Sequence, residues 1–423
     1  GLALVFVPGI MAAENWDDHD RSGNYISIDF AYNMLKSCEP NSIIFSYGDN
    51  DTFPLWYAQE VEEFRPDVRV SNLSYLRADW YVSQMLRKSY ESDPLPASMT
   101  LDQYVTGTRD IVLATDRISQ PLNVKRAIDF VLSDKPETKM SSPFERNKTI
   151  DFFPTRNLSL PVDKEVIKGK QVVSPHRLNQ VVDTMRWRLP SNYMFKDGLF
   201  LMDLMAHNNW QRPMYFAITV STDTYQNLDK YFQMEGLTYR IVPIESNRTD
   251  GRYGTVDTER MYNNLINKYA YRSIANEKVY INENSSRIIS NYRNIFGRLA
   301  RDLIAEGKVD SAITVLDKCM EVVPHETVPF NFFALTLIES YYKAGSIEKG
   351  VEYSTVYMEQ CAEELAYFLA LPNKFSANSR RDIELNLYIL QELYKMASTY
   401  ENGSHKAKLE ELFSVLENSL QNV

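Results

Sequence analysis

Two carboxylates flank an asparagine directly after an apolar run near the start of the chain. Asp49, Asn50, Asp51 and Thr52 follow residues 42–47, which have the character of a buried strand. In an open α/β sheet, ligands bind outside the carboxyl ends of the strands, where such a segment would lie. Carboxylate and amide oxygens coordinate divalent cations, and they also accept hydrogen bonds from sugar hydroxyls. Because the same residue types form turns and helix caps, the segment predicts either a ligand site or a shaped turn.

A second polar cluster lies close to the N-terminus and consists of Asp17, Asp18, His19, Asp20 and Arg21. Aspartate and histidine together suit a divalent metal ion, and histidine suits acid–base chemistry because it titrates near neutral pH. The spacing matches neither an EF-hand loop nor an HExxH motif. The cluster therefore predicts a ligand site or, alternatively, a solvated loop. A possible divalent cation is the one cofactor that these acids suggest.

A third candidate site combines Trp210 and Arg212 with two preceding asparagines, Asn208 and Asn209. An aromatic ring beside a guanidinium group suits a carbohydrate or a carboxylate ligand. The alternative is structural, because asparagine often ends a helix and Pro213 could precede a strand. The sequence contains no phosphate-loop, Rossmann-glycine, nucleophile-elbow or kinase motif, so no catalytic residue is predicted.

The composition is that of a globular protein with an acidic balance. The chain has 423 residues, of which 44% are hydrophobic and 24% charged, and this length suits two or three domains. The formal net charge of −10 argues against a nucleic-acid partner, which would favour a basic surface. Cys38, Cys319 and Cys361 show no metal-binding spacing, and the sequence leaves their pairing open.

The first thirteen residues, 1–13, are almost wholly apolar and carry no charge. A transmembrane helix needs about 20 apolar residues, so this segment is too short to span a bilayer alone. We interpret it as the end of a longer transmembrane helix that precedes the chain. The alternative is a buried first strand or helix.

The elements that would position the candidate residues follow an alternating pattern. Strand-like and helix-like segments succeed one another, which is typical of a Rossmann-like domain with a parallel or mixed sheet. We place this α/β domain at residues 14–257, with an irregular insertion at about 91–190. The predicted strands are residues 42–47, 67–73, 214–220 and 239–243, and the predicted helices are residues 55–61, 79–87, 199–207 and 223–234.

The remainder of the chain, residues 258–423, predicts an all-α domain. Three glycine-containing segments at 305–312, 343–350 and 401–408 each separate two long helical patterns. The first unit fits the tetratricopeptide pattern of large, small and proline positions, and the later units fit it less closely. We predict three stacked helical hairpins, which form either a binding groove for a protein partner or a structural cap.

Several long blocks resemble a known family, among them NWDDHDRSGNY, SCEPNSIIFSYGDNDTFPLWYAQEVE, NNWQRPMYFAITV and YFQMEGLTYRIVPI. They are similar to the C-terminal soluble region of bacterial multi-spanning membrane proteins that resemble protein O-mannosyltransferases. This integral-membrane glycosyltransferase family was formerly a domain of unknown function. The resemblance implies that an upstream transmembrane bundle holds the catalytic acid and that this region faces the periplasm, at the inner membrane of a Gram-negative-type bacterium.

The leading hypothesis is therefore a non-catalytic, extracytoplasmic region of a membrane protein O-glycosyltransferase. Its expected partners are its own transmembrane bundle and an acceptor protein or glycan. One alternative is a stand-alone metal-dependent hydrolase or transferase that uses the Asp17–Asp20 and Asp49–Asp51 clusters. The other is a protein–protein interaction module formed by the helical hairpins.

Overall fold

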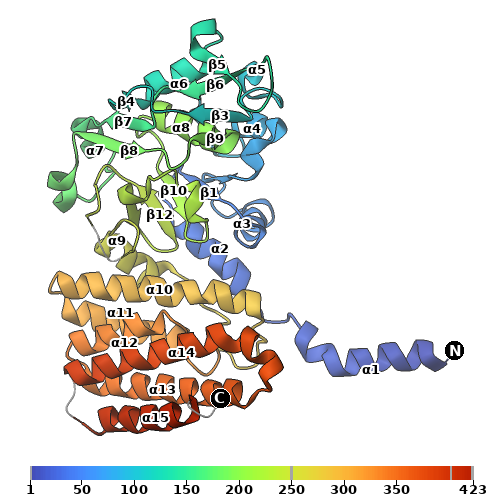
Figure 1. The fold of residues 1–423 in the computed structure, drawn as a ribbon, viewed down its shortest axis with the longest axis vertical. Coiled ribbons are helices and arrows are strands. Elements are labelled where there is room, and N and C mark those ends of the chain that lie inside the picture. The colour runs from blue at the N-terminus through green and yellow to red at the C-terminus, as the bar shows by residue number, and fades with distance from the viewer. Residues whose placement is uncertain (1, 248–250, 401–402, 421–423) are drawn as a thin grey trace. The chain divides into compact units, whose positions relative to one another are not determined.

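The protein divides into two compact units, which are described separately (Figure 1). The structure is a computed structural model that describes residues 2–247, 251–400 and 403–420. One unit is formed by residues 28–264 with 268–270. The other is formed by residues up to 27, by 265–267 and by residues from 271 onward. The prediction of an α/β region followed by an all-α region is confirmed.

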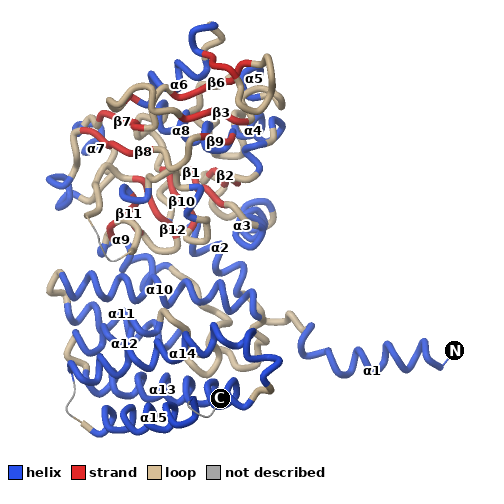
Figure 2. Tube along the Cα trace, viewed as in Figure 1, coloured by secondary structure: helices blue, strands red, loops and turns tan. Residues whose placement is uncertain are grey.

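A mixed six-stranded sheet is the centre of the α/β unit (Figure 2). Strand β1 pairs in parallel with a neighbour on each side, and the strands beyond β10 include antiparallel pairs. The four residues of each of β1, β2, β10 and β12 are buried. Burial on both faces explains the apolar runs of β1 and β10, whereas β2 and β12 also bury polar and charged side chains. The sheet order is β13 (Thr255–Val256), β11 (Phe232–Met234), β12 (Thr238–Ile241), β10 (Met214–Ala217), β1 (Ile43–Ser46) and β2 (Arg69–Asn72).

Helices of the α/β unit connect and flank these strands. Helix α3 begins at Asp49 with Gly48 as its N-cap, so the predicted start at residue 55 is too late. Aspartates in the first turn favour this early start because they complement the helix dipole. The helices are α2 (Ile26–Ser37), α3 (Asp49–Glu60), α4 (Asp79–Met85), α5 (Leu101–Tyr104), α6 (Val124–Leu132), α7 (Lys164–Gly169), α8 (Lys196–His207) and α9 (Thr258–Tyr262).

The segment predicted as an irregular insertion at about 91–190 is more regular than expected. It contributes most of two further sheets, whose strands have only two to five residues, too few for a period of two to be recognised in the sequence. One sheet has the order β5 (Lys139–Ser141), β6 (Thr149–Phe153), β3 (Ile111–Ala114) and β9 (Tyr193–Phe195). The other has the order β4 (Leu122–Asn123), β7 (Asn157–Pro161) and β8 (Thr184–Arg188).

The helix predicted at residues 223–234 is also absent from the described fold. Two 3₁₀ turns and strand β11 occupy this stretch instead. Gln226 and Asn227 have positive φ angles of 51° and 58°, which an α-helix does not accommodate. The tertiary structure thus overrides the local apolar pattern at this point.

The helical unit contains three antiparallel hairpins (Figure 1). Gly307 and Gly345 end the first helix of the first two hairpins with φ angles of 76° and 78°, a conformation that glycine adopts without strain. Residues 401 and 402 of the third predicted turn lie outside the described residues. The tetratricopeptide-like character of the hairpins stays a prediction. The helices are α10 (Glu283–Ala305), α11 (Val309–Val322), α12 (Ala334–Lys343), α13 (Ile347–Ala370), α14 (Asn373–Tyr400) and α15 (Ser404–Leu420).

The structure describes both the apolar N-terminal segment and the three cysteines. Residues Leu2–His19 form helix α1, and no described helix is both long and apolar enough to cross a membrane. Cys38, Cys319 and Cys361 are free and buried. Burial raises the pKa of each of these thiols to about 12, so they are expected to be unreactive.

Candidate functional site

A buried polar network lies at the carboxyl ends of three neighbouring parallel strands, β2, β1 and β10 (Figure 2). The hydroxyl of Thr219, just after β10, donates to Oδ2 of Asp51 at 2.6 Å. The hydroxyls of Ser46 and Thr52 lie 2.8 Å apart. Asn72, the last residue of β2, donates from Nδ2 to Oγ1 of Thr52 at 2.8 Å. The structure therefore places Asp51 and Thr52 at the strand ends where the sequence predicted them.

The four polar residues of the predicted GDNDT segment differ in burial. Asp51 and Thr52 are buried, whereas Asp49 and Asn50 are exposed. Burial raises the pKa of the Asp51 carboxyl, and the hydrogen bond from Thr219 partly opposes this rise. Since the carboxylate of Asp51 is satisfied by groups of its own fold, its chief task is to hold three strand ends together.

The raised pKa of Asp51 gives a testable pH dependence. A carboxyl with a raised pKa binds its proton more tightly in the folded state, so folding loses stability as pH rises from the unfolded-state pKa of about 3.9 to the folded-state pKa. Asparagine does not titrate, so the free energy of unfolding of the Asp51→Asn variant should rise relative to that of the wild type as pH increases across this interval. Below the interval, the difference between the two proteins should not depend on pH. Urea denaturation between pH 3 and 7 measures the difference.

A second variant sharpens that experiment. Thr219→Val removes the hydrogen bond that lowers the pKa of Asp51, so the interval should extend to higher pH. A stability difference between wild type and Asp51→Asn that does not change with pH would contradict the assignment.

Asn72 connects this network to the next turn of the chain. Its Oδ1 accepts hydrogen bonds from the hydroxyl of Ser74 at 2.7 Å and from the main-chain nitrogen of Tyr75 at 3.1 Å. Its Nδ2 also donates to the carbonyl oxygen of Tyr47 at 3.1 Å. Asn72 consequently connects the main chain at Tyr75 to Thr52 in the first turn of α3.

Tyr75 lies within a row of aromatic rings that crosses from α3 to α4. Its ring is nearly parallel to that of Trp56, at 6.0 Å between centroids, and lies 6.3 Å from that of Trp80. Phe53 extends the row beyond Trp56 at 5.8 Å. Trp80 is 55% exposed, and Trp56 and Tyr75 are half-buried. Tryptophan rings held in fixed positions at a surface are suited to binding a flat apolar face.

Trp56 and Trp80 of this row border a cavity of about 660 Å³, which we call the aromatic groove. Its walls come from α3, β2, α4 and the segment that follows α4. The volume falls within the range typical of small-molecule sites. Its aromatic lining residues are Trp56, Trp80, Tyr81 and Tyr90, and its polar lining residues include Arg69, Gln84, Arg87, Lys88 and Glu60.

The structure predicts that Asn72 supports the groove. Replacing Asn72 with alanine leaves the Tyr47 carbonyl and the Tyr75 amide without their partner, and we expect a loss of about 2–3 kcal/mol in unfolding free energy. Urea denaturation followed by tryptophan fluorescence measures this loss. Asn72→Asp places a buried carboxylate oxygen against the Tyr47 carbonyl oxygen, so it should destabilise the fold at least as much as the alanine variant. A loss below about 0.5 kcal/mol for the alanine variant would count against the network.

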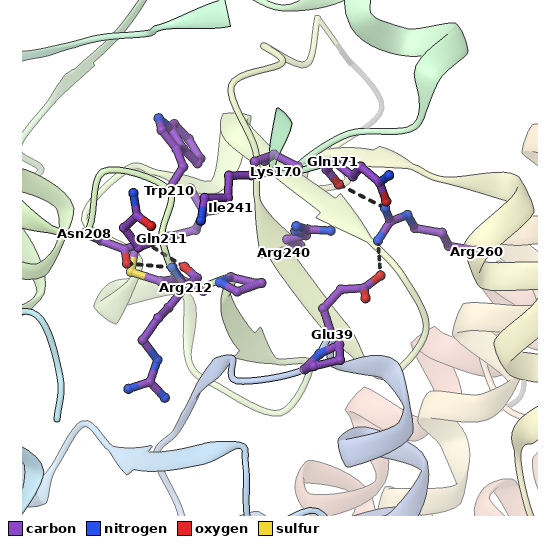
Figure 3. A pocket seen from close by; sticks show the side chains of 14 residues that line it. Glu39, Lys170, Gln171, Asn208, Trp210, Gln211, Arg212, Arg240, Ile241 and Arg260 are labelled. Carbon is purple, nitrogen blue, oxygen red and sulfur yellow. Dashed lines mark hydrogen bonds and ion pairs between the residues drawn. The ribbon is translucent and has the colours of Figure 1, made fainter. Parts of the chain in front are cut away.

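Trp210 and Arg212 border a different and smaller cavity, of about 230 Å³ (Figure 3). Figure 3 shows the side chain of Arg212 running away from the group formed by Arg240, Arg260 and Glu39. Its guanidinium group donates to main-chain carbonyl oxygens of Asn41, Ser42, Asp93 and Pro94 and to the hydroxyl of Ser92. Arg212 therefore ties the start of β1 to the segment after α4.

The ring of Trp210 has a packing role. It lies against a buried apolar cluster that contains Ile167, Val172 and Val242. Trp210 also has a positive φ angle of 58°, within the turn that joins α8 to β10. The structure thus separates Trp210 and Arg212 from the Asp51 network.

Sequence analysis missed a buried charged cluster beside this cavity. Glu235 accepts hydrogen bonds from the hydroxyl of Tyr215 at 2.9 Å and from Nε2 of Gln233 at 2.6 Å, and it lies 3.5 Å from Nη1 of Arg240. Tyr215, Arg240 and Gln233 are direct neighbours across β10, β12 and β11. Burial raises the pKa of Glu235, and Arg240 opposes this rise. In the sequence, this cluster is marked by Glu235 and Arg240, two charged residues within the largely apolar stretch YFQMEGLTYRIVPI.

The cluster near the N-terminus belongs to the helical unit. His19 is exposed and lies within 3.0 Å of the Asn15 carbonyl oxygen, and Asp20 accepts a hydrogen bond from the main-chain nitrogen of Ser22 at 2.7 Å. Arg21 is exposed, and the side chains of Asp17 and Asp18 lie outside the described part of the structure. Among the residues whose side chains are described, no group of three or more His, Cys, Asp or Glu could hold a metal ion.

The family comparison covers the unit that contains the groove. A family model described as TMEM260-associated domain 2 matches residues 27–260, more than half of the chain. The chain belongs to this family. TMEM260 is a protein O-mannosyltransferase-like protein, so TMEM260-associated domain 2 is related to a glycosyltransferase-like membrane protein, as the resemblance implied. Neither the curated proteins nor the solved structures contain a match to the chain.

Proposed function

We propose that this member of the TMEM260-associated domain 2 family is a non-catalytic, extracytoplasmic region of a membrane protein O-glycosyltransferase. Its aromatic groove binds a saccharide, either on the acceptor or on the growing glycan. The family match supports the glycosyltransferase context. The row of Trp56, Tyr75 and Trp80, held in place by the polar network behind it, is the observation that carries the binding role.

The chemistry of the groove fits a sugar ring. A pyranose presents an apolar face of C–H groups, which packs on an aromatic face, while its hydroxyls at the ring edge require hydrogen-bond partners. Trp56 and Trp80 supply aromatic faces, and Gln84, Arg87 and Glu60 supply polar groups along the same cavity. Such a mixture of apolar wall and few polar groups is typical of ligand pockets.

The Asp51 network supports a binding role in preference to a catalytic one. The carboxylate of Asp51 is buried and bonded to Thr219 and Thr52. A catalytic carboxyl must contact the reacting atoms, whereas Asp51 contacts groups of its own fold. Within this proposal, the GDNDT segment shapes the groove by positioning Asn72 and, through it, Tyr75.

Binding measurements on the full chain test the proposed role of the groove. We expect a bound oligosaccharide, identified on a glycan array and titrated by calorimetry, to lose at least about tenfold in affinity in the Trp80→Ala variant. Trp16→Ala is a matched control because Trp16 is an exposed tryptophan of α1 and does not line the groove. Absence of saccharide binding, or equal binding by wild type and Trp80→Ala, would contradict the proposal.

The location at the membrane is a separate part of the proposal. The expected arrangement is an inner-membrane protein of a Gram-negative-type bacterium, with this region in the periplasm. A reporter that is active only in the periplasm, fused to the C-terminus of the natural full-length protein, should be active. A reporter that works only in the cytoplasm should be silent at the same position, and the reverse pattern would refute the orientation.

A further inference from the structure

Arg69 lines the aromatic groove, and its guanidinium group has no carboxylate partner among the described residues. Arg69 is the first residue of β2 and is only 5% exposed. Its Nη2 donates to the carbonyl oxygens of Arg87 and, at 3.4 Å, Asp93. Its Nε has no hydrogen-bond partner among the described residues, and no described carboxylate forms an ion pair with it. This buried cation therefore has one N–H group, at Nε, that is left without an acceptor in the described structure.

Other buried arginines of the α/β unit are balanced within the fold. All three nitrogens of the Arg212 guanidinium group donate hydrogen bonds, chiefly to carbonyl oxygens. Arg240 lies 3.5 Å from the carboxylate of Glu235. Arg69 differs from both because it has neither a full set of acceptors nor a counter-ion within the described structure.

A buried cation without a counter-ion is costly, and a bound anion would relieve that cost. Burial lowers the pKa of Arg69, which reflects the penalty on its charged form. Burial and the positive charge of Arg69 also lower the pKa of nearby Arg212, to about 10. A carboxylate or another oxyanion could accept two hydrogen bonds from a planar guanidinium group, and such charge-assisted bonds are stronger than neutral ones.

The charged residues that line the groove also favour an anion. Three of them are cationic, Arg69, Arg87 and Lys88, and one is acidic, Glu60. Glu60 accepts a hydrogen bond from the hydroxyl of Tyr90, so its carboxylate already has a partner. This local excess of positive charge occurs in a chain whose formal net charge is −10.

We propose that the ligand of the aromatic groove is an acidic saccharide, whose carboxylate binds Arg69 while a sugar ring packs against the exposed ring of Trp80. This inference rests on the saccharide-binding role proposed above. It adds a chemical class of ligand and a residue that selects it. Arg87 and Lys88 lie on the same cavity and contribute longer-range attraction.

Paired ligands test the inference. Uronate-containing oligosaccharides and the same oligosaccharides with their carboxylates reduced to hydroxymethyl groups would be titrated into the full chain by calorimetry. The wild type should bind the acidic member of a pair at least about tenfold more tightly, since a hydrogen bond to a charged group contributes strongly. Arg69→Met, which keeps an unbranched side chain but removes the guanidinium group and its charge, should lose this preference and retain its affinity for the reduced member.

The outcomes separate the two proposals. Arg126→Met is the control for loss of one positive charge, because Arg126 is exposed on α6 and lies outside the groove. Equal binding of acidic and reduced ligands by the wild type would overturn the acidic-ligand inference and leave the saccharide role standing. Absence of binding to both would overturn both proposals. The wild-type comparison decides the matter even if Arg69→Met does not fold, and an unchanged preference in a folded Arg69→Met variant would also overturn the inference.

Discussion

Replacing Arg212 with methionine is expected to lower the unfolding free energy of the α/β unit by about 3–5 kcal/mol. The buried guanidinium group donates to the carbonyl oxygens of Asn41 at 2.8 Å, Ser42 at 3.1 Å and Asp93 at 2.6 Å. Methionine fills a similar volume but offers no donor, so these acceptors would lose their partner. Because the acceptors belong to two separate segments, the loss also loosens the connection between β1 and the residues after α4.

Urea denaturation of the wild type and the Arg212→Met variant measures this effect. Arg212→Lys should have an intermediate effect, because an ammonium group has three donors and cannot reproduce the geometry of the planar guanidinium group. Arg126→Met, an exposed change of the same kind, should stay within about 0.5 kcal/mol of the wild type. If Arg212→Met unfolds as the wild type does but loses saccharide binding, Arg212 is a ligand residue and its structural assignment is wrong.

Replacing Arg293 with methionine should destabilise the helical unit by about 3–5 kcal/mol. Arg293 is fully buried on α10, and its guanidinium group donates to carbonyl oxygens of the segment between α11 and α12. These acceptors include Val323 at 3.1 Å, Pro329 at 2.7 Å and Val328. The segment lacks regular hydrogen bonding of its own, so its carbonyl groups depend on this side chain. The guanidinium group also lies 5.0 Å from the centre of the Phe330 ring.

Far-ultraviolet circular dichroism during thermal unfolding reports this effect because the helical unit contributes much of the helix signal. The control is Arg381→Met, an exposed substitution on α14 that should leave the unfolding midpoint nearly unchanged. An Arg293→Met variant with the midpoint of the wild type would show that water or a rearranged loop satisfies these carbonyls. The assigned role of Arg293 would then be wrong.

The structure changes the interpretation of the GDNDT segment. The sequence left a choice between a ligand site and a shaped turn, and the acids do not behave alike. Asp51 and Thr52 form a buried network with Asn72 and Thr219, whereas Asp49 and Asn50 are exposed at the start of α3. The network in turn fixes Tyr75 between Trp56 and Trp80. The segment therefore anchors the turn that carries Tyr75, whose ring lies beside those of Trp56 and Trp80.

The sequence by itself determined the order of the main elements. Strands β1 and β10 are buried on both faces, so their apolar runs were recognisable, and the glycines at 307 and 345 marked the turns of two helical hairpins. Short strands between residues 91 and 190 escaped recognition because two to five residues do not display a period. Helix 223–234 was predicted wrongly because its apolar residues serve β11 and its core contacts.

Only the tertiary structure decided which side chains meet. Trp56 and Trp80 lie on different helices, and they border one groove because α3 and α4 flank the same edge strand, β2. Arg212 looked like a ligand residue from its neighbours in the sequence, yet its partners are more than 100 residues away at Ser92 and Asn41. Local sequence patterns specify helices and strands through backbone preference and periodic burial. The partners of a buried charge, by contrast, depend on strand pairing between distant segments, and that pairing placed Arg69 in the groove without a counter-ion among the described residues.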